Sequence, residues 1–438
     1  MSGNNRFHLA WFLQGSSIQA WGAPWSGNIS EEWMTADMFV DLARNIERAG
    51  FDYLLIEDSI YVGQNWQNSR DIFLKNGMSI PRQEPTVIAT LMAQATKYLG
   101  IVPTLSTFAY HPYLVARIVG TLDQVSSGRA GWNMVTGSSD FSAQNFGMDA
   151  LPPHDTRYEM AHEYIDVVTR LWDSWEPGAI VADRKTGVLI DPEKVHTIDY
   201  KGKYYASRGP LNSGPAPQGR PVIAQAGGSG PGRAIAAKYA DTIVAAPKGV
   251  EAMKEYRNDV RRQMAALGRD PDGCKILFLI APIVATSREE AHIRADRRRA
   301  DAEENIDIRL AQFGWTTNLD LSGFDLDAPI GELTTNGHQS SLTTFLKRAT
   351  GKTLREAMVS YSISGGSYDF VGTPDDIAGE MDEVMQEIGG DGFLFYLGDV
   401  SRKSVAEITD GLIPALQQRG LTRTGFGGPH LRDNLLEF

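Results

Sequence analysis

The sequence predicts an α/β protein built as a closed (β/α)8 barrel with several insertions, and three observations lead to this fold class. Eight short apolar runs occur along the chain, and they hardly alternate with polar residues, as is typical of parallel strands buried on both faces. Segments with helical spacing of apolar residues separate these runs, which indicates right-handed crossovers. The chain has 438 residues, whereas a bare barrel needs roughly 250, so the surplus belongs in insertions.

The expected strands are spread over the whole chain, and eight of them fit a closed barrel better than an open doubly wound sheet. Predicted strands and helices alternate along the chain, so each strand and the helix that follows it form one β/α unit. The strands are expected at residues 7–13, 51–56, 100–105, 132–135, 221–226, 242–245, 276–284 and 393–397.

Capping residues and prolines predict where the helices begin and end. Thr35 caps a first helix, which Gly50 ends, and Asp155 is expected to cap a long helix after the fourth strand. In the helix after residue 84, Leu91 and Tyr98 are assigned to the buried face. Prolines mark the first turns of three helices, at Pro85, Pro112 and Pro374. Further helices are expected at 234–239, 250–267, from Ser287 onward, and at 405–416.

Four insertions account for the surplus length, and none of them looks like an independent domain. They are expected near residues 16–33, 59–82, 176–219 and 314–372, so residues 1–438 form a single domain. Trp21 and Trp25 lie in the first insertion and Trp11 just before it. These three side chains favour a planar substrate, although packing in a core explains them equally well.

Composition excludes several classes of function. The net charge of −12 and the pI near 5.2 argue against nucleic-acid and anionic-membrane partners. The basic run 294–299 is interleaved with acidic residues, as on a solvated helix face. We expect no membrane span and no signal peptide, and therefore a cytoplasmic protein. Cys274 is the sole cysteine, so the chain can form neither an internal disulfide nor a cysteine-based zinc site.

Polar residues follow four successive strands at the end where a barrel enzyme carries its active site. They are Asp58, the segment 104–107, the segment 133–139 and Ser229. Each has a structural explanation when taken alone: a carboxylate can cap a helix, Thr104 can be a strand residue, and Asn133 can be a core amide. Their occurrence at consecutive strand ends favours a functional site.

The segment 227–233, Gly-Gly-Ser-Gly-Pro-Gly-Arg, is the strongest local motif. Gly228, Ser229 and Gly230 can present backbone N–H groups at a helix N-terminus, which predicts a phosphate cradle. The segment lacks the GxGxxG pattern and the Lys-Ser/Thr of a P-loop, so neither NAD nor ATP is expected. A simple glycine-rich turn is the alternative.

His154 and Tyr158 are four residues apart at the start of a helix and therefore share a face. No Glu, Asp or third His falls at a matching spacing, so we expect no metal site. No GxSxG motif occurs, and Cys274 opens an apolar run, which leaves nucleophilic catalysis without a candidate.

Several motifs together resemble the bacterial-luciferase-like, FMN-dependent monooxygenases. The resemblance covers nearly the whole chain, and it is specific to the branch of nitrilotriacetate, dibenzothiophene-sulfone and dimethyl-sulfide monooxygenase large components. The motifs are Ala-Arg (116–117), Thr-Leu-Asp-Gln (121–124), Ser-Gly-Arg (127–129), Trp-Asn-Met-Val-Thr (132–136), Asn-Phe-Gly-Met (145–148), His-Asp-Thr-Arg-Tyr (154–158), Gln-Ala-Gly-Gly-Ser (225–229) and Leu-Arg-Asp-Asn-Leu (431–435).

This resemblance implies a TIM barrel that binds FMN as FMNH2 and uses O2 as co-substrate. The family's FMN-binding residues correspond to Asp58, Thr104, His154, Tyr158 and Ser229. Asp58 would lie beside the isoalloxazine ring, and the last three would surround the phosphate. Thr104, together with Asn133, would flank the oxygen-reactive ring edge.

The resemblance further implies a two-component monooxygenase acting on an organosulfur compound, an amine or a heterocycle. A separate NAD(P)H:flavin reductase would supply FMNH2, and we expect a homodimer or homotetramer. Some relatives that act on sulfones have histidines in the first insertion, where Gln19 and Trp21 stand here, so His338 becomes the substrate-side candidate. Riboflavin cleavage, deazaflavin-dependent dehydrogenation and flavin binding without catalysis are the alternatives.

Overall fold

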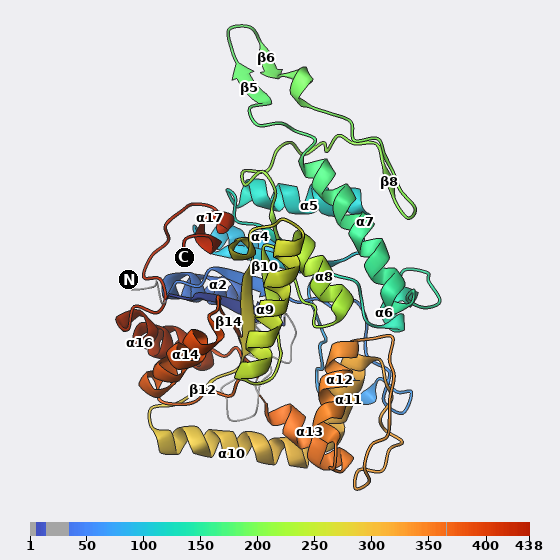
Figure 1. The fold of residues 1–438 in the computed structure, drawn as a ribbon, viewed down its shortest axis with the longest axis vertical. Coiled ribbons are helices and arrows are strands. Elements are labelled where there is room, and N and C mark those ends of the chain that lie inside the picture. Colours follow the sequence, from blue (N-terminus) through green and yellow to red (C-terminus); the bar gives the residue numbers. More distant parts are fainter. Residues whose placement is uncertain (1–5, 15–34, 365) are drawn as a thin grey trace.

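A closed barrel of eight parallel strands forms the centre of the computed structural model, which describes residues 6–14, 35–364 and 366–438 (Figure 1). Around the barrel the strands follow the order β1-β14-β11-β10-β9-β4-β3-β2. The predicted fold class is therefore confirmed. The barrel strands are β1 (His8–Leu13), β2 (Tyr53–Ile56), β3 (Gly100–Ser106), β4 (Gly131–Val135), β9 (Val222–Gln225), β10 (Thr242–Ala245), β11 (Lys275–Ile280) and β14 (Gly392–Tyr396).

The seventh strand was predicted at residues 276–284, but it ends earlier than predicted. β11 ends at Ile280, and Pro282 then interrupts the apolar run. Proline has no N–H group to donate to a ladder, so the run cannot continue as one strand. Its last two residues form β12 (Ile283–Val284), which pairs outside the barrel with β13 (Val371–Gly372).

Helices cover the outside of the barrel, and most of them begin where the capping residues predict. Thr35 and Gly50 cap the two ends of α2. The helices α4, α5 and α14 each have a proline in the first turn. Their bounds are α2 (Ala36–Ala49), α4 (Pro85–Ala95), α5 (Pro112–Val125), α7 (His154–Trp172), α8 (Gly230–Tyr239), α9 (Val250–Ala266), α14 (Pro374–Ile388), α15 (Arg402–Ala406), a π-helical turn (Glu407–Leu412) and α16 (Ile413–Gln418).

Three predictions about these helices are wrong. Pro153, not Asp155, is the N-cap of α7, because the helix already includes His154. α8 begins at Gly230 rather than 234, since Ser229 caps it. Leu91 and Tyr98 are exposed, because α4 ends at Ala95 and buries a narrower face than the sequence suggested.

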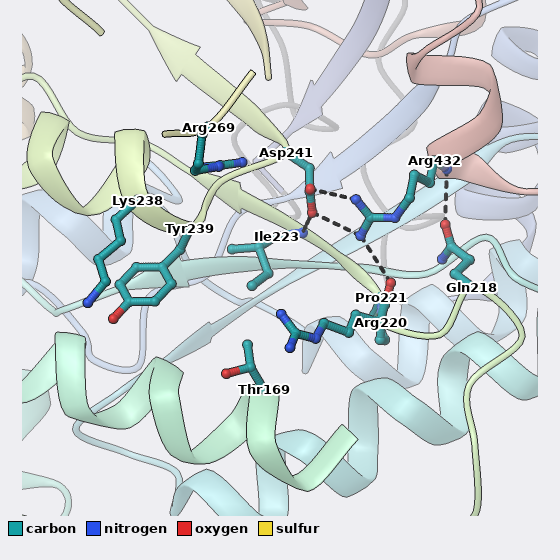
Figure 2. Close-up of a pocket in the computed structure, with 10 residues that line it drawn as sticks. All are labelled: Thr169, Gln218, Arg220, Pro221, Ile223, Lys238, Tyr239, Asp241, Arg269 and Arg432. Atoms are coloured by element: carbon teal, nitrogen blue, oxygen red, sulfur yellow. Dashed lines mark hydrogen bonds and ion pairs between the residues drawn. The ribbon is translucent and has the colours of Figure 1, made fainter. Parts of the chain in front are cut away.

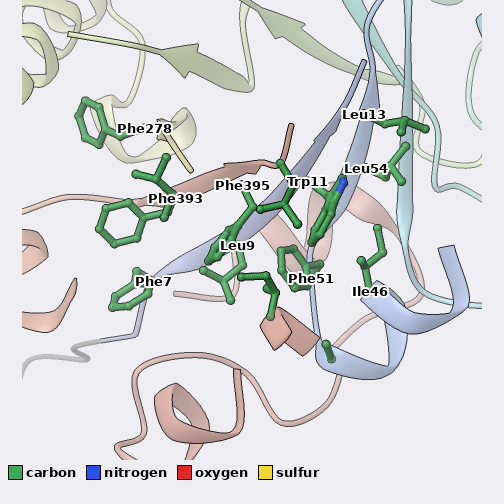
Figure 3. Packing of buried hydrophobic residues seen from close by; sticks show 14 of the residues in the cluster. Phe7, Leu9, Trp11, Leu13, Ile46, Phe51, Leu54, Phe278, Phe393 and Phe395 are labelled. Carbon is green, nitrogen blue, oxygen red and sulfur yellow. The ribbon is translucent and has the colours of Figure 1, made fainter. Parts of the chain in front are cut away.

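Two apolar layers hold the barrel together. Between the strands and the outer helices, Trp11 is fully buried, and its ring packs edge-on against Phe51 with 5.7 Å between centroids (Figure 3). Trp11 is therefore a core residue and not part of a substrate wall. Inside the barrel, alternate strand residues such as Tyr53, Val102 and Leu277 form a second cluster.

A short C-terminal helix, α17 (Leu431–Leu435), closes the amino end of the barrel. Leu431 and Leu435 belong to the interior cluster. A Cβ atom on Gly100, the first residue of β3, would lie 2.4 Å from Leu431 Cδ1, so only glycine permits this close approach. Because the amino end is filled in this way, ligands can reach the barrel centre only from the carboxyl end of the strands.

Two of the predicted insertions lie at opposite ends of the long axis in Figure 1. The segment 176–219 projects from the body as two small antiparallel pairs, whereas the helices of 314–372 pack with α3 and α10 around a separate apolar cluster. The elements are α3 (Asp71–Lys75), α6 (Asp140–Gln144), β5 (Ile180–Asp183), β6 (Val188–Ile190), β7 (Tyr200–Lys201), β8 (Ala206–Ser207), α10 (Arg288–Glu304), α11 (Ile306–Thr317), α12 (Gln339–Ala349) and α13 (Leu354–Ile363), with single 3-10 turns at Pro192–Lys194 and Pro271–Gly273.

The predicted insertion 16–33, with Gln19, Trp21 and Trp25, lies outside the described residues. Within the described part of the chain, no helix has both the length and the apolar character needed to cross a membrane.

Candidate functional site

Thr104 and Asn133 form a buried polar pair inside the barrel, towards the carboxyl end of its strands. They are paired in register on β3 and β4, and their residues are 2% and 3% exposed. Asn133 Nδ2 donates a hydrogen bond of 2.7 Å to Thr104 Oγ1. This leaves the Thr104 hydroxyl proton free to donate and Asn133 Oδ1 free to accept.

Further polar atoms in this region lack a partner. Among the described residues, none forms a hydrogen bond with Asn133 Oδ1, Ser106 Oγ or Gln225 Oε1, although all three atoms are buried. An unsatisfied buried group of this kind costs about 1–3 kcal/mol. Gln225 is in register with Met134 of the outer apolar cluster, so its side chain leaves β9 on the outer face. Ser106 and Asn133 lie on the inward faces of the neighbouring strands β3 and β4, and these two groups indicate a place for a polar ligand.

The glycine-rich turn after β9 forms a cradle at the start of α8. Ser229 is the N-cap of α8, and its Oγ accepts a hydrogen bond of 3.2 Å from Gly232 N. A Cβ on Gly232 would lie 3.3 Å from Tyr158 Oη, so Tyr158 of α7 reaches the same turn. A Cβ on Gly228 would lie 2.9 Å from Ser340 Cβ. The positive end of the α8 dipole therefore faces hydroxyl groups from three elements, which suits a phosphate.

His154 and Tyr158 lie together on α7, as their spacing predicts. Their ring centroids are 4.8 Å apart, and His154 Nδ1 lies 2.8 Å from Asp155 Oδ1. Because the Tyr158 hydroxyl reaches the turn that Ser229 caps, both aromatic residues stand beside the cradle.

His338 stands at the N-cap of α12, on the same side as these residues. Desolvation by the surrounding protein and the charges of Arg157 and His154 lower its pKa. Asn336, two residues before His338, accepts hydrogen bonds from Arg157 of α7, so His338 lies near the start of α7. The structure therefore brings it towards the turn that Ser229 caps, and no hydrogen bond among the described residues joins it to Thr104 or Asn133.

Arg157 is a residue that the sequence reasoning did not single out, although it lies in the His-Asp-Thr-Arg-Tyr motif. It is 3% exposed, and its guanidinium donates to Asn336 O at 2.7 Å and Pro152 O at 2.6 Å. Arg157 thus fastens the segment before α12 to the start of α7, which positions His338 and Ser340. Its place in a motif between two predicted site residues was the available signal.

Asp58 follows β2 in a cluster of charged side chains. Desolvation raises its pKa to about 7, and Glu57 and Glu84 act in the same direction, while Arg82 opposes them. Arg82 Nη1 lies 2.5 Å from Glu57 Oε2. A carboxyl group with this pKa can hold or release a proton near neutral pH.

These four groups of residues follow one another around half of the barrel. Asp58 comes after β2, Thr104 lies on β3, Asn133 on β4 and Ser229 after β9, and these strands are adjacent in the order β9-β4-β3-β2. Within the described residues, no group of three or more His, Cys, Asp or Glu side chains could hold a metal ion.

A polar cleft of about 330 Å³ lies elsewhere, at the amino ends of β9 and β10 (Figure 2). Its cations are held by neighbouring groups: Arg432 Nη1 lies 2.6 Å from Asp241 Oδ1, and Arg269 donates to the carbonyls of Ala237 and Ala240 at 2.8 Å each. Arg220 forms a two-point ion pair with Asp173. Since these charges are already paired and the predicted site residues lie elsewhere, the cleft serves as a structural junction.

Comparisons with known proteins find relatives that match nearly the whole chain. Residues 15–392 match the family model of the luciferase-like monooxygenases. The N-acetyl-S-(2-succino)cysteine monooxygenase of Bacillus subtilis (strain 168) is 32% identical over 440 residues, covering 99% of this chain and 97% of that protein. Component A of the nitrilotriacetate monooxygenase of Aminobacter aminovorans is 32% identical over 453 residues, covering 99% and 97%.

Among solved structures, a riboflavin lyase in complex with modified FMN and riboflavin superposes with a TM-score of 0.90. It is 30% identical in sequence, and the match covers 99% of this chain and 96% of that one.

Proposed function

The chain belongs to the luciferase-like monooxygenase family, and on this premise we propose that it is the oxygenase component of a two-component enzyme, which uses FMNH2 and O2 to oxygenate or oxidatively cleave a small organic substrate. The observation that carries the proposal is the buried Thr104–Asn133 pair, which keeps one free hydroxyl donor and one free carbonyl acceptor next to a phosphate cradle.

The residues present fit FMN. Ser229, Tyr158 and His154 would hold the phosphate with the N–H groups of Gly228 and Gly230, where the α8 dipole favours a dianion. The unpartnered oxygens of Asn133 and Ser106 would take polar groups of the ribityl chain and the ring. Bound FMNH2 would supply the electrons that activate O2.

The side chains around the ring would orient the reactants and exclude water. Asn133 Oδ1 can accept a ring N–H, while the Thr104 hydroxyl can donate to an oxygen atom on which negative charge develops. Asp58 can hold a proton near neutral pH. His338 would help to bind the phosphate rather than act on the substrate, because it lies near His154 and Arg157.

A separate NAD(P)H:flavin reductase would be the partner. The chain has no dinucleotide-binding fingerprint, and the Aminobacter aminovorans relative is named as a component A. The relevant assembly would be a homodimer or homotetramer in the cytoplasm.

A coupled assay tests this function. The purified protein is mixed with FMN, NADH, a surrogate flavin reductase and ¹⁸O2, and thioethers, amines and heterocycles are screened for products that contain ¹⁸O. We expect ¹⁸O in one product class and its loss when the reductase is omitted. The Asn133→Ala variant serves as the control for flavin that reacts free in solution.

Other outcomes identify the alternatives. Riboflavin added as substrate and consumed only in the presence of FMNH2 would identify a riboflavin-cleaving enzyme. Hydride transfer to a deazaflavin without O2 would identify a dehydrogenase. Tight FMN binding without any substrate-dependent O2 uptake would leave a flavin carrier, and the oxygenase proposal would then be wrong.

A further inference from the structure

The other half of the barrel mouth, formed by β1, β14 and β11, carries a different set of groups. Tyr396 is the last residue of β14, and its ring packs against Phe12 of β1 with 6.0 Å between centroids. No described residue forms a hydrogen bond with the Tyr396 hydroxyl. This hydroxyl is therefore available to a ligand at the centre of the mouth.

Three arginines from separate segments lie within electrostatic reach of this hydroxyl. Burial raises the pKa of Tyr396 and Glu57 acts in the same direction, whereas Arg298, Arg309 and Arg82 lower it. Arg82 ends the second predicted insertion, Arg298 lies on α10 and Arg309 on α11. α10 and α11 thus bring two cations, and the segment before α4 a third, close to the Tyr396 hydroxyl.

These cations have more donors than the nearby carboxylates satisfy. The Arg82 side chain is 4% exposed, and Glu57 takes only Nη1, so Nε and Nη2 are buried without a partner among the described residues. Arg309 pairs with Asp301, but its Nε is likewise unpartnered. Arg298 has no hydrogen bond or ion pair with any residue that the structure describes.

Arg298 also corrects the prediction that the basic run 294–299 forms a solvated helix face. Arg299 is exposed, but Arg298 is half-buried, and desolvation lowers its pKa, as does Arg309, while Tyr396 and Asp369 oppose them. A guanidinium that loses water without gaining a partner is costly. A bound anion would offset that cost.

We propose that Arg298, with Arg82, Arg309 and Tyr396, binds a carboxylate of the substrate, so that the enzyme acts on small organic carboxylates rather than on neutral molecules. The proposal rests on the function proposed above and specifies its substrate class. A planar carboxylate matches the paired N–H groups of a guanidinium. The FMN phosphate would be held across the barrel, at Ser229 after β9, and so does not compete for these arginines.

Binding to the full chain without flavin tests the subsite independently of activity. Succinate and benzoate are titrated by calorimetry, each against its amide, succinamide and benzamide. We expect at least one carboxylate to bind about tenfold more tightly than its amide, and Arg298→Met to weaken that binding by about tenfold to a hundredfold. Arg299→Met, which removes an exposed charge from the same helix, should leave it unchanged.

The affinity for FMN separates this proposal from the function on which it rests. Arg298→Met should retain the affinity of the wild type for FMN, because the phosphate lies on the other half of the mouth. An equal loss of carboxylate binding in Arg299→Met, equal binding of acid and amide, or a parallel loss of FMN affinity in Arg298→Met would overturn the subsite. Absence of FMN binding by the wild type, with carboxylate selectivity intact, would overturn only the flavin-dependent function.

Discussion

The two ends of the barrel differ in whether their buried polar groups have hydrogen-bond or ion-pair partners. At the amino end, Arg423 and Asp52 are both 1% exposed and lie 2.5 Å apart, while Arg423 Nη1 also binds Glu437 at 2.7 Å. His8 Nδ1 lies 3.1 Å from the same Asp52 carboxylate. At the carboxyl end, Asn133, Ser106, Gln225 and Arg82 keep buried atoms without a partner among the described residues.

This difference separates polar groups that stabilise the fold from polar groups that have no structural partner among the described residues. Burial alone would raise the pKa of Asp52, but His8 and Arg423 hold it below the usual range, so the ionised form stabilises the fold. Asp58 at the mouth has a raised pKa and opposes folding when it is charged. Such a trade between stability and activity is expected at functional sites.

Removal of Arg423 should produce the largest effect on stability. Arg423→Met leaves the Asp52 carboxylate buried without its guanidinium partner, which should lower the free energy of unfolding by about 3–5 kcal/mol. Urea denaturation at pH 7 measures the change. Arg48→Met, which breaks the exposed pair with Asp410, is the matched control and should have a much smaller effect. Equal losses in both variants would contradict the structural role of the amino-end network.

Asn133→Ala should chiefly affect turnover. The substitution removes an unsatisfied carbonyl, so stability should change little, whereas the loss of one oriented polar group next to the reacting atoms should lower kcat by about 10²–10³-fold. Single-turnover kinetics with pre-formed FMNH2 measures this step, and the FMNH2 affinity should remain nearly unchanged. Normal turnover would mean that the reacting atoms lie elsewhere in the barrel.

Changes at the phosphate cradle should have an intermediate effect on affinity. Ser229→Ala and Tyr158→Phe each remove a hydroxyl that would bind the phosphate, so FMNH2 binding should weaken by about 1–3 kcal/mol. Anaerobic titration provides the measurement, and riboflavin, which has no phosphate, should bind equally well to the variants and the wild type. If both variants bind FMNH2 like the wild type, the phosphate must lie at another helix terminus.

Replacement of Asp58 should have the smallest effect and the opposite sign from that of Arg423. Its folded pKa of about 7 exceeds the ordinary value, so the carboxyl group lowers stability progressively as pH rises from about 4 to 7. Asp58→Asn should therefore stabilise the protein by on the order of 1 kcal/mol at pH 8, after allowance for solvent screening, and by less at pH 5. Urea titrations at the two pH values provide the test, with the exposed Asp71→Asn as a control.

The sequence was sufficient to predict the barrel strands, because their apolar runs and the helices between them follow simple periodicities. That Thr104 and Asn133 lie close together also follows, since they belong to consecutive strands of the predicted barrel. Burial of Arg298 could not be predicted, because its helix shows the charge pattern of a solvated face and only the tertiary packing of α10 removes water from this side chain. Arg157 and Arg423 were missed for a related reason, since their partners come from segments remote in sequence.

The pairing of β1 with β14 has a consequence for biosynthesis. The two strands close the barrel, yet β14 follows β1 by on the order of 380 residues, which corresponds to tens of seconds of translation. Until β14 emerges, the strands from β1 to β11 can form only an open sheet, in which the edges of β1 and β11 that later pair with β14 stay exposed. A nascent chain of this kind exposes a surface that favours aggregation. We therefore expect the yield of native protein to depend on chaperones that shield the open edge until β14 emerges.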